Sequence, residues 1–249
     1  MVLKAHSAAT PEPLVVWHDL ECGAYRADLS LWRELADAHP HGTILDIGAG
    51  TGRVALDLAR RGRRVIALDH EPALLDELRR RAEGLDIETL CADARSFQLP
   101  RSERVALCLA PMQTVQLLGG VDRRSSFLRC ARAHLLSGGL LACALVTELE
   151  PFDSLADGLG PTPEVCEIAG VRYRSQATRV QAGANRIVIE RHRSIGDSAL
   201  SERDLVELDR IGAAELEREG AAVGLRPAPS RQVQSTEDHA GSAVVMLHV

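Results

Sequence analysis

The sequence has few aromatic residues, no long apolar run and no closely spaced cysteine pair, and each absence excludes a class of protein. Aromatic residues make up 3% of the 249 positions, too few for the rows of rings that stack on single-stranded nucleic acid. No apolar run approaches the roughly 18–20 residues of a membrane helix, and the first residues lack the apolar core of a signal peptide. None of the six cysteines forms a C-x-x-C pair, so we expect reduced thiols in a cytoplasmic protein.

A surplus of basic residues is also absent. The chain has 29 Lys and Arg residues against 35 Asp and Glu residues, a net charge of −6. Proteins that bind nucleic acid usually carry a basic face, so we expect no nucleic-acid partner and, without an apolar span, no membrane partner. The 45% hydrophobic and 26% charged residues are typical of a globular protein, and the length fits one enlarged domain.

Short apolar runs alternate with helical segments between Thr43 and Val146. Helical spacing over residues 13–38 predicts one helix before them, ended by Pro40. Strands are expected at residues 43–47, 64–68, 87–91, 104–110 and 140–146, and helices at 54–61, 71–82 and 123–136. Because the apolar runs do not alternate with polar residues, they indicate parallel strands buried on both faces. The pattern predicts an open α/β sheet with helices on both faces.

A different pattern follows in residues 150–208. Polar and apolar residues alternate over 171–180 and 186–195 with turn residues between, which is typical of a hairpin. We interpret 150–208 as an antiparallel β insertion, a lid or a dimer contact, within a single domain of residues 1–249 whose residues 1–41 form a helical cap. A helix at 213–223 and a strand in 239–249 are then expected. Pro227 and Pro229 favour an edge strand between them.

A glycine-rich turn lies where the first strand meets the first helix of the sheet. Its sequence runs from Asp46 through Gly48, Gly50 and Gly52 to Arg53. Glycines there allow backbone angles that other residues avoid and let a ligand press on the main chain. A dinucleotide turn would read G-x-G-x-x-G and a P-loop would end in Gly-Lys-Ser/Thr, and neither pattern is present. The spacing favours an adenosine ligand without a pyrophosphate.

Two acidic residues follow the next two strands. Asp69 ends the second strand and can accept hydrogen bonds from both hydroxyls of a ribose. Enzymes that bind nicotinamide cofactors hold the ribose in the same way, so Asp69 alone does not separate the two kinds of ligand. As an alternative, Asp69 caps the helix that follows. Asp93, with Ala94, follows the third strand and can accept the amine of an adenine, or it is a surface turn residue.

Together these residues resemble the class I S-adenosylmethionine-dependent methyltransferases, whose first motif D/E-x-G-x-G-x-G is matched in full by residues 46–52. The resemblance implies a Rossmann-like seven-stranded sheet of order 3-2-1-4-5-7-6 with strand 7 antiparallel. It implies S-adenosylmethionine as cofactor and S-adenosylhomocysteine as product. Tyr25 resembles a position that closes over the ligand, with core packing as the alternative. The cofactor-binding residues that the resemblance implies are Asp46, Gly48, Ala49, Gly50, Gly52, Asp69, His70, Leu74, Asp93, Ala94, Ala110 and Tyr25.

The segment after the fourth strand carries information about the methyl acceptor. The D/N-P-P-Y/F motif of enzymes that methylate base amino groups is replaced by Ala110-Pro111-Met112-Gln113, which favours a small-molecule acceptor. Gln113 and Gln116 could hydrogen-bond that acceptor. Methyl transfer from a sulfonium needs mainly alignment, so no base is required.

Residues of the insertion are also candidates on the acceptor side. Tyr173 and His192 lie on paired strands and could share a face over the pocket, so Tyr173 is a substrate candidate. The weak catalytic candidates are His192, Tyr173 and Gln113, each with a structural role as its alternative. The alternating arginines of the same hairpin could hold an acidic substrate or form a salt-bridged face; they are Arg172, Arg174, Arg191 and Arg193.

Three functions remain open from the sequence alone. The first is methyl transfer to a small molecule, by a chain that could form a homodimer. The second is a protein that binds the cofactor without transferring methyl. The third, an NAD-dependent oxidoreductase, is disfavoured by the glycine spacing. No metal site is expected, because His39 and His41 have no Cys or carboxylate ligands nearby.

Overall fold

The computed structural model describes residues 12–158, 160–196, 201–236 and 239–249. The first eleven residues of the expected N-terminal cap therefore lie outside the described ranges. The first half of the chain forms α1 (Pro13–Cys22), α2 (Leu29–Asp37), β1 (Ile44–Ile47), α3 (Arg53–Arg60), β2 (Val65–Asp69), α4 (Pro72–Arg81), β3 (Ile87–Cys91), η1 (Pro100–Ser102), β4 (Val105–Ala110) and η2 (Gln116–Leu118). The second half forms α5 (Val121–His134), β5 (Leu135–Leu145), β6 (Phe152–Asp153), α6 (Ser154–Asp157), β7 (Glu164–Ile168), β8 (Val171–Ala182), β9 (Arg186–Ile195), β10 (Glu202–Asp209), α7 (Ala213–Ala222), β11 (Arg226–Val233) and β12 (Ser242–His248).

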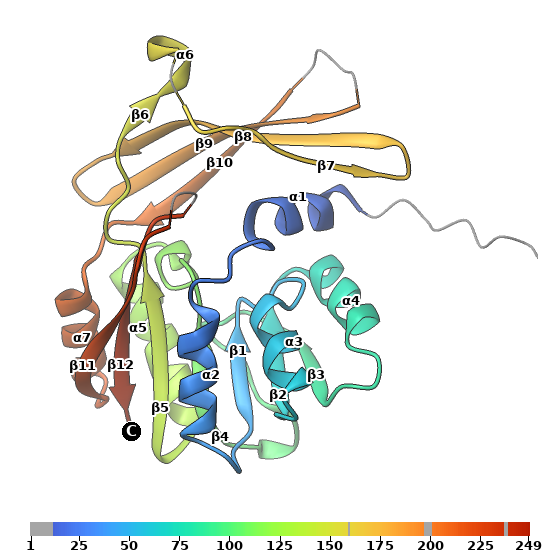
Figure 1. Cartoon of the computed structure of the whole chain (residues 1–249). Coiled ribbons are helices and arrows are strands. Elements are labelled where there is room, and N and C mark those ends of the chain that lie inside the picture. The colour runs from blue at the N-terminus through green and yellow to red at the C-terminus, as the bar shows by residue number, and fades with distance from the viewer. Residues whose placement is uncertain (1–11, 159, 197–200, 237–238) are drawn as a thin grey trace, which may run out of the picture.

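The main sheet has seven strands in the order β11-β12-β5-β4-β1-β2-β3 (Figure 1). Ile44 of β1 pairs in parallel with Val65 on one side and Leu107 on the other. β12 runs antiparallel to both β5 and β11. The strand order and the antiparallel strand predicted from the sequence are confirmed.

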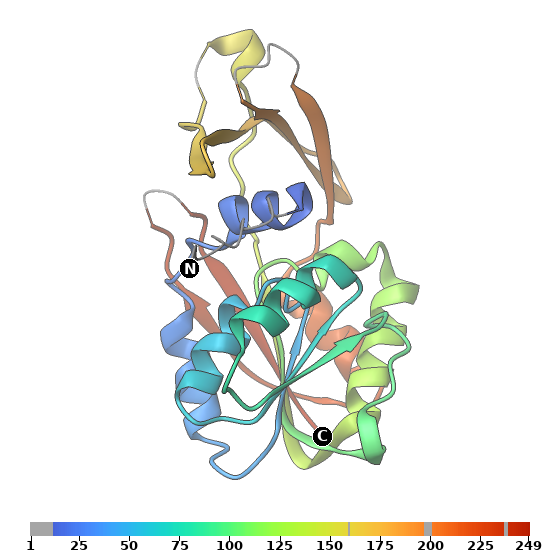
Figure 2. The ribbon, with the colours of Figure 1, turned by 90° about the vertical axis from the view of Figure 1, so that its right-hand side faces the viewer.

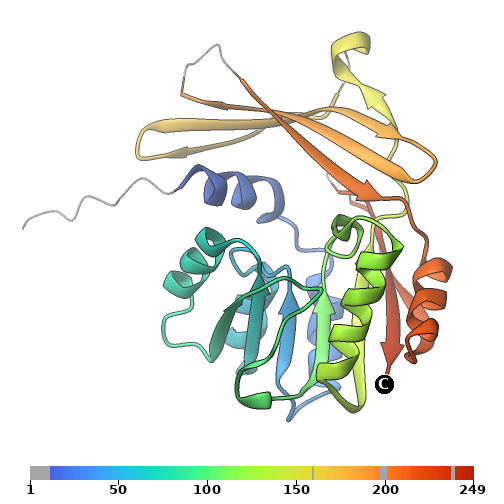
Figure 3. The same ribbon diagram turned by 180° about the vertical axis from the view of Figure 1, so that it is seen from behind.

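Helices cover both faces of this sheet. α2 and α3 lie over one face in Figure 1, and α5 and α7 lie over the other in Figure 3. Because both faces are covered, β1, β2 and most of β4 are buried, and apart from Asp46 and Asp69 they are apolar. Trp32 of α2 and Phe127 of α5 are fully buried on opposite faces.

The proline-bearing strand β11 forms one edge of the main sheet, as expected. Its pairing with β12 shifts register between Ala228 and Arg231, on either side of Pro229. A proline cannot donate a hydrogen bond to a neighbouring strand, so it is tolerated at an edge or a bulge.

A second, five-stranded sheet has the order β10-β9-β8-β6, with β7 also paired to β8. It lies above the carboxyl ends of the parallel strands, and α1 lies between the two sheets (Figure 2). The expected antiparallel insertion and its hairpin, β8 and β9, are confirmed.

Two expected element boundaries are wrong. The helix expected over residues 13–38 is broken into α1 and α2, and the Gly23 amide closes α1 on the carbonyl of Asp19. One straight helix could not serve both surfaces, because α1 packs under the second sheet and α2 packs on the main sheet. The helix expected to reach residue 136 ends at His134, because Leu135 already pairs with Val105 in the main sheet.

Candidate active site

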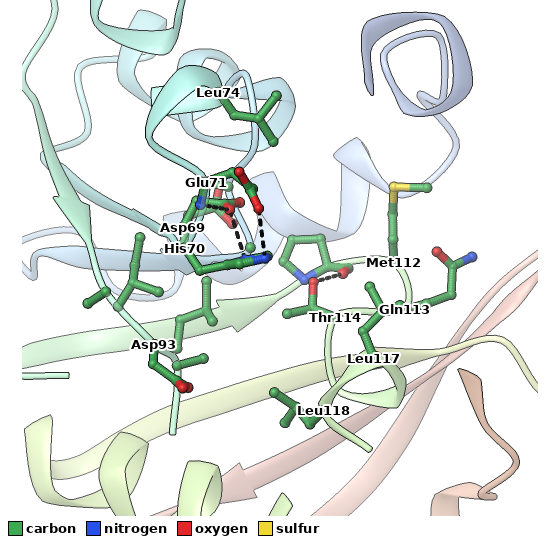
Figure 4. Close-up of a pocket in the computed structure, with 18 of the residues that line it drawn as sticks. Asp69, His70, Glu71, Leu74, Asp93, Met112, Gln113, Thr114, Leu117 and Leu118 are labelled. Atoms are coloured by element: carbon green, nitrogen blue, oxygen red, sulfur yellow. Dashed lines mark hydrogen bonds and ion pairs between the residues drawn. The ribbon is translucent and has the colours of Figure 1, made fainter. Parts of the chain in front are cut away.

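A cavity of about 420 Å³ opens at the carboxyl ends of β1, β2, β3 and β4 (Figure 4). Small-molecule sites typically measure about 300–1,000 Å³. The cavity lies where the sheet order reverses, since β2 and β3 extend to one side of β1 and β4 to the other. Open α/β sheets bind their ligands at this point.

The glycine turn forms one wall of the cavity. Gly48, Gly50 and Gly52 have φ values of +71°, +54° and +97°, a region that other residues rarely adopt. The amides of Gly48 and Ala49 both donate to the carbonyl of Leu68, which fixes the turn against β2. A Cβ on Gly52 would lie 2.2 Å from Leu78 of α4. Gly48 and Ala49 line the cavity, whereas Gly50 and Gly52 lie outside its lining.

Asp46 is the buried acid of this wall. It is 1% exposed, it lines the cavity, and among the described residues neither of its carboxylate oxygens has a hydrogen-bond partner. Burial raises the pKa of Asp46 to about 7, and the nearby Arg53 and the backbone amide of Ala55 oppose that rise. A buried carboxylate without a partner is costly, so a cationic or hydrogen-bond-donating ligand group would meet an unfilled acceptor here.

Asp69 is held at the end of β2 by two backbone amides. Its Oδ2 accepts from Gly50 at 2.8 Å and its Oδ1 from Glu71 at 3.1 Å. A carboxylate has about four acceptor positions, so acceptor positions remain for a ligand in the cavity that Asp69 lines. The exposed ring of His70 bridges Asp69 and Glu71, at 3.3 and 3.4 Å (Figure 4).

The end of β3 supplies a second acid beside small apolar side chains. Arg95 donates to both oxygens of Asp93, and these hydrogen bonds lower the pKa of Asp93 to about 2. Ala92 and Ala94, on either side of Asp93, and Leu74 of α4 also line the cavity. This end of the cavity therefore combines an ionised carboxylate with an apolar wall.

The loop after β4 forms the opposite wall. Met112 has a φ of +55°, which is uncommon for any residue except glycine and is often found at functional sites. Met112, Gln113 and Thr114 line the cavity with Leu117 and Leu118 (Figure 4). Sequence reasoning found Gln113 but missed the others, although their position directly after a buried strand was the available signal.

The structure does not place Tyr25 or Ala110 at the cavity. Tyr25 is buried in the core, with the Arg53 guanidinium 5.1 Å and the His239 ring 5.0 Å from its ring centre. Tyr25 follows α1 at the point where the helix breaks, so it packs against the sheet rather than over a ligand. Ala110 is fully buried beneath the wall that Pro111 begins.

The expectation that Gln116 binds an acceptor is contradicted by its contacts. Its side-chain Nε2 donates to the carbonyls of Val146 and Asp209, and its Oε1 accepts from the amide of Val146. Gln116 is fully buried, and its amide joins the end of β5 to the end of β10. It has a structural role.

Tyr173 and His192 do not share a face. His192 pairs with Gln176 and Tyr173 pairs with Ile195, and positions three apart on one strand point to opposite faces. Tyr173 packs edge-on against Trp17 of α1, with ring centres 5.4 Å apart. His192 lines a separate cavity of about 340 Å³, and neither residue lines the larger one.

Helix α1, part of the expected helical cap, contributes two lining residues that the sequence did not single out. Its His18 and Cys22 line the cavity, as does Arg53, which is paired with Asp28. One turn along α1 from His18, Glu21 pairs with Arg193 and lies 3.8 Å from Arg191. These two arginines of the hairpin therefore hold α1. Of the two roles expected for the hairpin arginines, binding an acidic substrate or forming a salt-bridged face, these contacts agree with the second.

Sequence comparisons place the chain among methyltransferases. A family model described as "Methyltransferase domain" matches residues 44–139. A probable cobalt-precorrin-6B C(15)-methyltransferase (decarboxylating) of Methanothermobacter thermautotrophicus is 30% identical over 149 residues, which is 57% of this chain and 72% of that protein. A probable ribosomal RNA small subunit methyltransferase A of Methanosarcina acetivorans is 39% identical over 71 residues, but the match spans only 28% of this chain and 26% of that protein.

Solved structures share the fold over nearly the whole chain. A sugar N-methyltransferase from Streptoalloteichus has a TM-score of 0.72 at 17% identity, covering 100% of this chain and 98% of that one. An amino pentose methyltransferase from Micromonospora echinaspora has a TM-score of 0.69 at 20% identity, covering 98% and 100%. At these identities the likeness establishes the fold.

Proposed function

Because this chain belongs to the class I S-adenosylmethionine-dependent methyltransferases, we propose that it transfers the methyl group of S-adenosylmethionine to a small-molecule acceptor. The observation that carries the proposal is that α1 adds His18 and Cys22 to the lining of the cavity. Helix α1 and the antiparallel sheet lie over the carboxyl edge of the main sheet (Figure 1). A site of about 420 Å³ beneath a helix fits a cofactor and part of a small molecule better than a folded RNA.

The comparisons support the same choice of acceptor. The match to the ribosomal RNA methyltransferase covers 28% of this chain, whereas the match to the cobalt-precorrin methyltransferase covers 57% of it. The loop after β4 also lacks the motif of enzymes that methylate base amino groups. A nucleic-acid acceptor is thus disfavoured by the chain's own residues and by the extent of the matches.

The residues around the cavity fit the cofactor part by part. We propose that Asp69 accepts the ribose hydroxyls, with His70 beside it, and that Asp93 and Ala94 meet the adenine against Leu74. The methionyl part would then lie along Gly48 and Ala49, where the unpartnered carboxylate of Asp46 offers an acceptor. Gly50 and Gly52 act indirectly, by shaping the turn.

The mechanism needs alignment more than acid–base chemistry. When bound, the cofactor supplies a methyl group activated by a sulfonium leaving group. Pro111 and Met112 would narrow the cavity at the reacting end, and Gln113 would orient the acceptor by a hydrogen bond. Helix α1 would exclude water from above. Orientation of this kind contributes up to about 7–11 kcal/mol in favourable cases.

Two further features of the proposal concern the setting of the enzyme. All six cysteines are free, which supports a reducing compartment such as the cytoplasm. Among the described residues, no helix is long and apolar enough to cross a membrane. A homodimer remains a prediction.

The proposed function is tested by titration and by methyl transfer. Calorimetry of the purified chain should give micromolar binding of S-adenosylmethionine and S-adenosylhomocysteine and none of NAD(H). Asp69→Ala should lower that affinity at least tenfold, while Asp76→Ala, an exposed acid on α4, should not. Transfer of a labelled methyl group should then be measured with amino sugars, small amines, phenols and ribosomal RNA. Labelling of RNA alone would refute the small-molecule proposal.

A further inference from the structure

Helix α1 lies directly on the glycine turn through His18. A Cβ built on Gly50 would lie 2.1 Å from Nε2 of His18 and 2.4 Å from its Cε1. The Nε2 edge of the ring is therefore in contact with Gly50, and His18 rather than Gly50 lines the cavity at this point. The absence of a side chain at Gly50 makes room for the ring.

The hydrogen bonds around His18 fix which ring nitrogen carries the proton. The hydroxyl of Thr51 donates to Oδ1 of Asp19 at 2.6 Å, and a hydroxyl has one hydrogen to donate. Thr51 therefore presents lone pairs to Nδ1 of His18, 3.3 Å away. Nδ1 must then be the donor in a neutral ring, which leaves an unshared electron pair on Nε2.

The acid that sets this arrangement is itself held in place. Arg81 of α4 donates to both oxygens of Asp19. Burial opposes ionisation of Asp19, but its hydrogen bonds with Arg81 and Thr51 and the nearby ring of His18, 4.0 Å away, hold its pKa far below the usual range. Asp19 is therefore a permanent acceptor for Thr51, and the orientation of the His18 ring follows from it.

The order of the strands indicates which part of the cofactor reaches His18. Along the sheet the order is β3, β2, β1 and β4. If Asp93 after β3 meets the adenine and Asp69 after β2 meets the ribose, the methionyl part lies at the turn after β1. That turn carries Gly48 and Gly50, and His18 covers it.

The groups at the turn favour a ligand group that donates hydrogen bonds. In the part of the chain that the structure describes, neither oxygen of Asp46 has a hydrogen-bond partner, and Nε2 of His18 is a further acceptor. Arg53, which follows the turn, already donates to both oxygens of Asp28 and to the carbonyl of Tyr25. The turn thus offers acceptors, and the guanidinium that could have held a carboxylate is occupied.

We propose that Nε2 of His18 accepts a hydrogen bond from the α-ammonium group of the cofactor's methionyl part, which makes His18 a cofactor-positioning residue supplied by α1. The inference rests on the proposed function, because it assumes an adenosyl cofactor in this cavity. It adds a contact from outside the glycine motif.

The test compares three ligands by calorimetry on the full chain. S-adenosylhomocysteine carries the ammonium, its deamino analogue keeps only the carboxylate, and 5′-methylthioadenosine lacks both groups. His18→Leu should weaken S-adenosylhomocysteine roughly tenfold or more, as expected for one hydrogen bond to a charged group. The affinities of the other two ligands should change less than about twofold. His41→Leu, an exposed histidine, is the matched control and should change none of them.

The outcomes separate this inference from the proposed function. Equal losses for all three ligands, or for the two that carry a carboxylate, would overturn the ammonium contact. So would unchanged binding of S-adenosylhomocysteine by a folded His18→Leu variant. If wild-type chain binds none of the three ligands, the proposed function itself fails. His18→Gln, which keeps a polar side chain, serves as a second variant should His18→Leu not fold.

Discussion

Arg193 of β9 donates two hydrogen bonds of 2.7 Å to the two carboxylate oxygens of Glu21 in α1. Ser175 of β8 donates a third, also of 2.7 Å. The antiparallel sheet therefore grips α1 from above, while His18 and Asp19 of the same helix contact the glycine turn below. The position of α1 over the cavity depends on both sets of contacts.

Arg193→Met should weaken the attachment of α1 to the antiparallel sheet. The substitution leaves the nearly buried Glu21 carboxylate without its bidentate partner, so we expect the free energy of unfolding to fall by about 1–3 kcal/mol. Chemical denaturation would measure the loss, and the fluorescence of Trp17, which packs on Tyr173, should change with it. Arg174→Met is the matched control on the other face of the sheet, since within the described ranges Arg174 donates to Gln176 alone. Equal losses in the two variants would contradict the grip.

The fold was largely predictable because its signals are local. Buried parallel strands appear as apolar runs, and the turn after β1 needs glycines at positive φ, so pattern and structure coincide there. Pro227 and Pro229 likewise identified the edge strand. The break between α1 and α2 was not predictable in this way, because helical spacing continues across Gly23 and only the two packing surfaces separate the helices.

The site was predictable where a single side chain reaches the cavity directly from the sheet. Asp46 lies in β1, Asp69 ends β2 and Asp93 follows β3, and all three line the cavity at the edge where the carboxyl ends of these strands meet. The residues on the methyl-acceptor side of the site were not predictable, because their positions depend on contacts between distant segments. Gln116 looked free in sequence, yet its partners Val146 and Asp209 lie far along the chain.

Gln116 and Gln113 should respond oppositely to replacement by leucine. Gln116→Leu leaves the amide and carbonyl of Val146 and the carbonyl of Asp209 without their hydrogen-bond partner. Each buried and unpaired group lowers the free energy of unfolding by about 1–3 kcal/mol. We expect a strong drop in melting temperature. Gln113→Leu should leave stability unchanged and raise the KM for the acceptor or lower kcat. Thermal melts with steady-state kinetics would decide, and a stable Gln116→Leu variant would contradict its structural role.

Gly50→Ala should be coupled to His18. The new methyl group would overlap the His18 ring and force alanine into a left-handed conformation, which costs about 1–2 kcal/mol by itself. We expect the overlap to add to that cost. His18→Ala removes the ring, so in the double variant the stability lost to the overlap should be recovered, whereas the cost of the left-handed conformation should remain. The double variant should therefore be more stable than the sum of the two single effects predicts. Additive losses in denaturant unfolding would show that the ring does not rest on Gly50.

Asp46 should make stability depend on pH. Burial raises the pKa of Asp46 from 3.8 to about 7, so the folded state holds a proton that the unfolded state releases. Stability from this group is therefore present below the unfolded pKa and is lost as the pH rises from 3.8 to about 7. Asparagine has the same shape and does not titrate. Asp46→Asn should thus gain about 2 kcal/mol relative to wild type between about pH 5 and about pH 8.

Asp57 is the control for this pH dependence, because its pKa is shifted in the opposite direction to that of Asp46. Hydrogen bonds from Arg33 lower the pKa of Asp57, so its stabilising contribution is present above the unfolded pKa and is lost only as the pH falls through the folded one. Between about pH 5 and about pH 8 both states of Asp57 are ionised. Asp57→Asn should therefore leave the pH slope of unfolding as in wild type, while Asp46→Asn flattens it. Parallel slopes for wild type and Asp46→Asn would mean that the Asp46 carboxylate is ionised, and so partnered, in the folded chain.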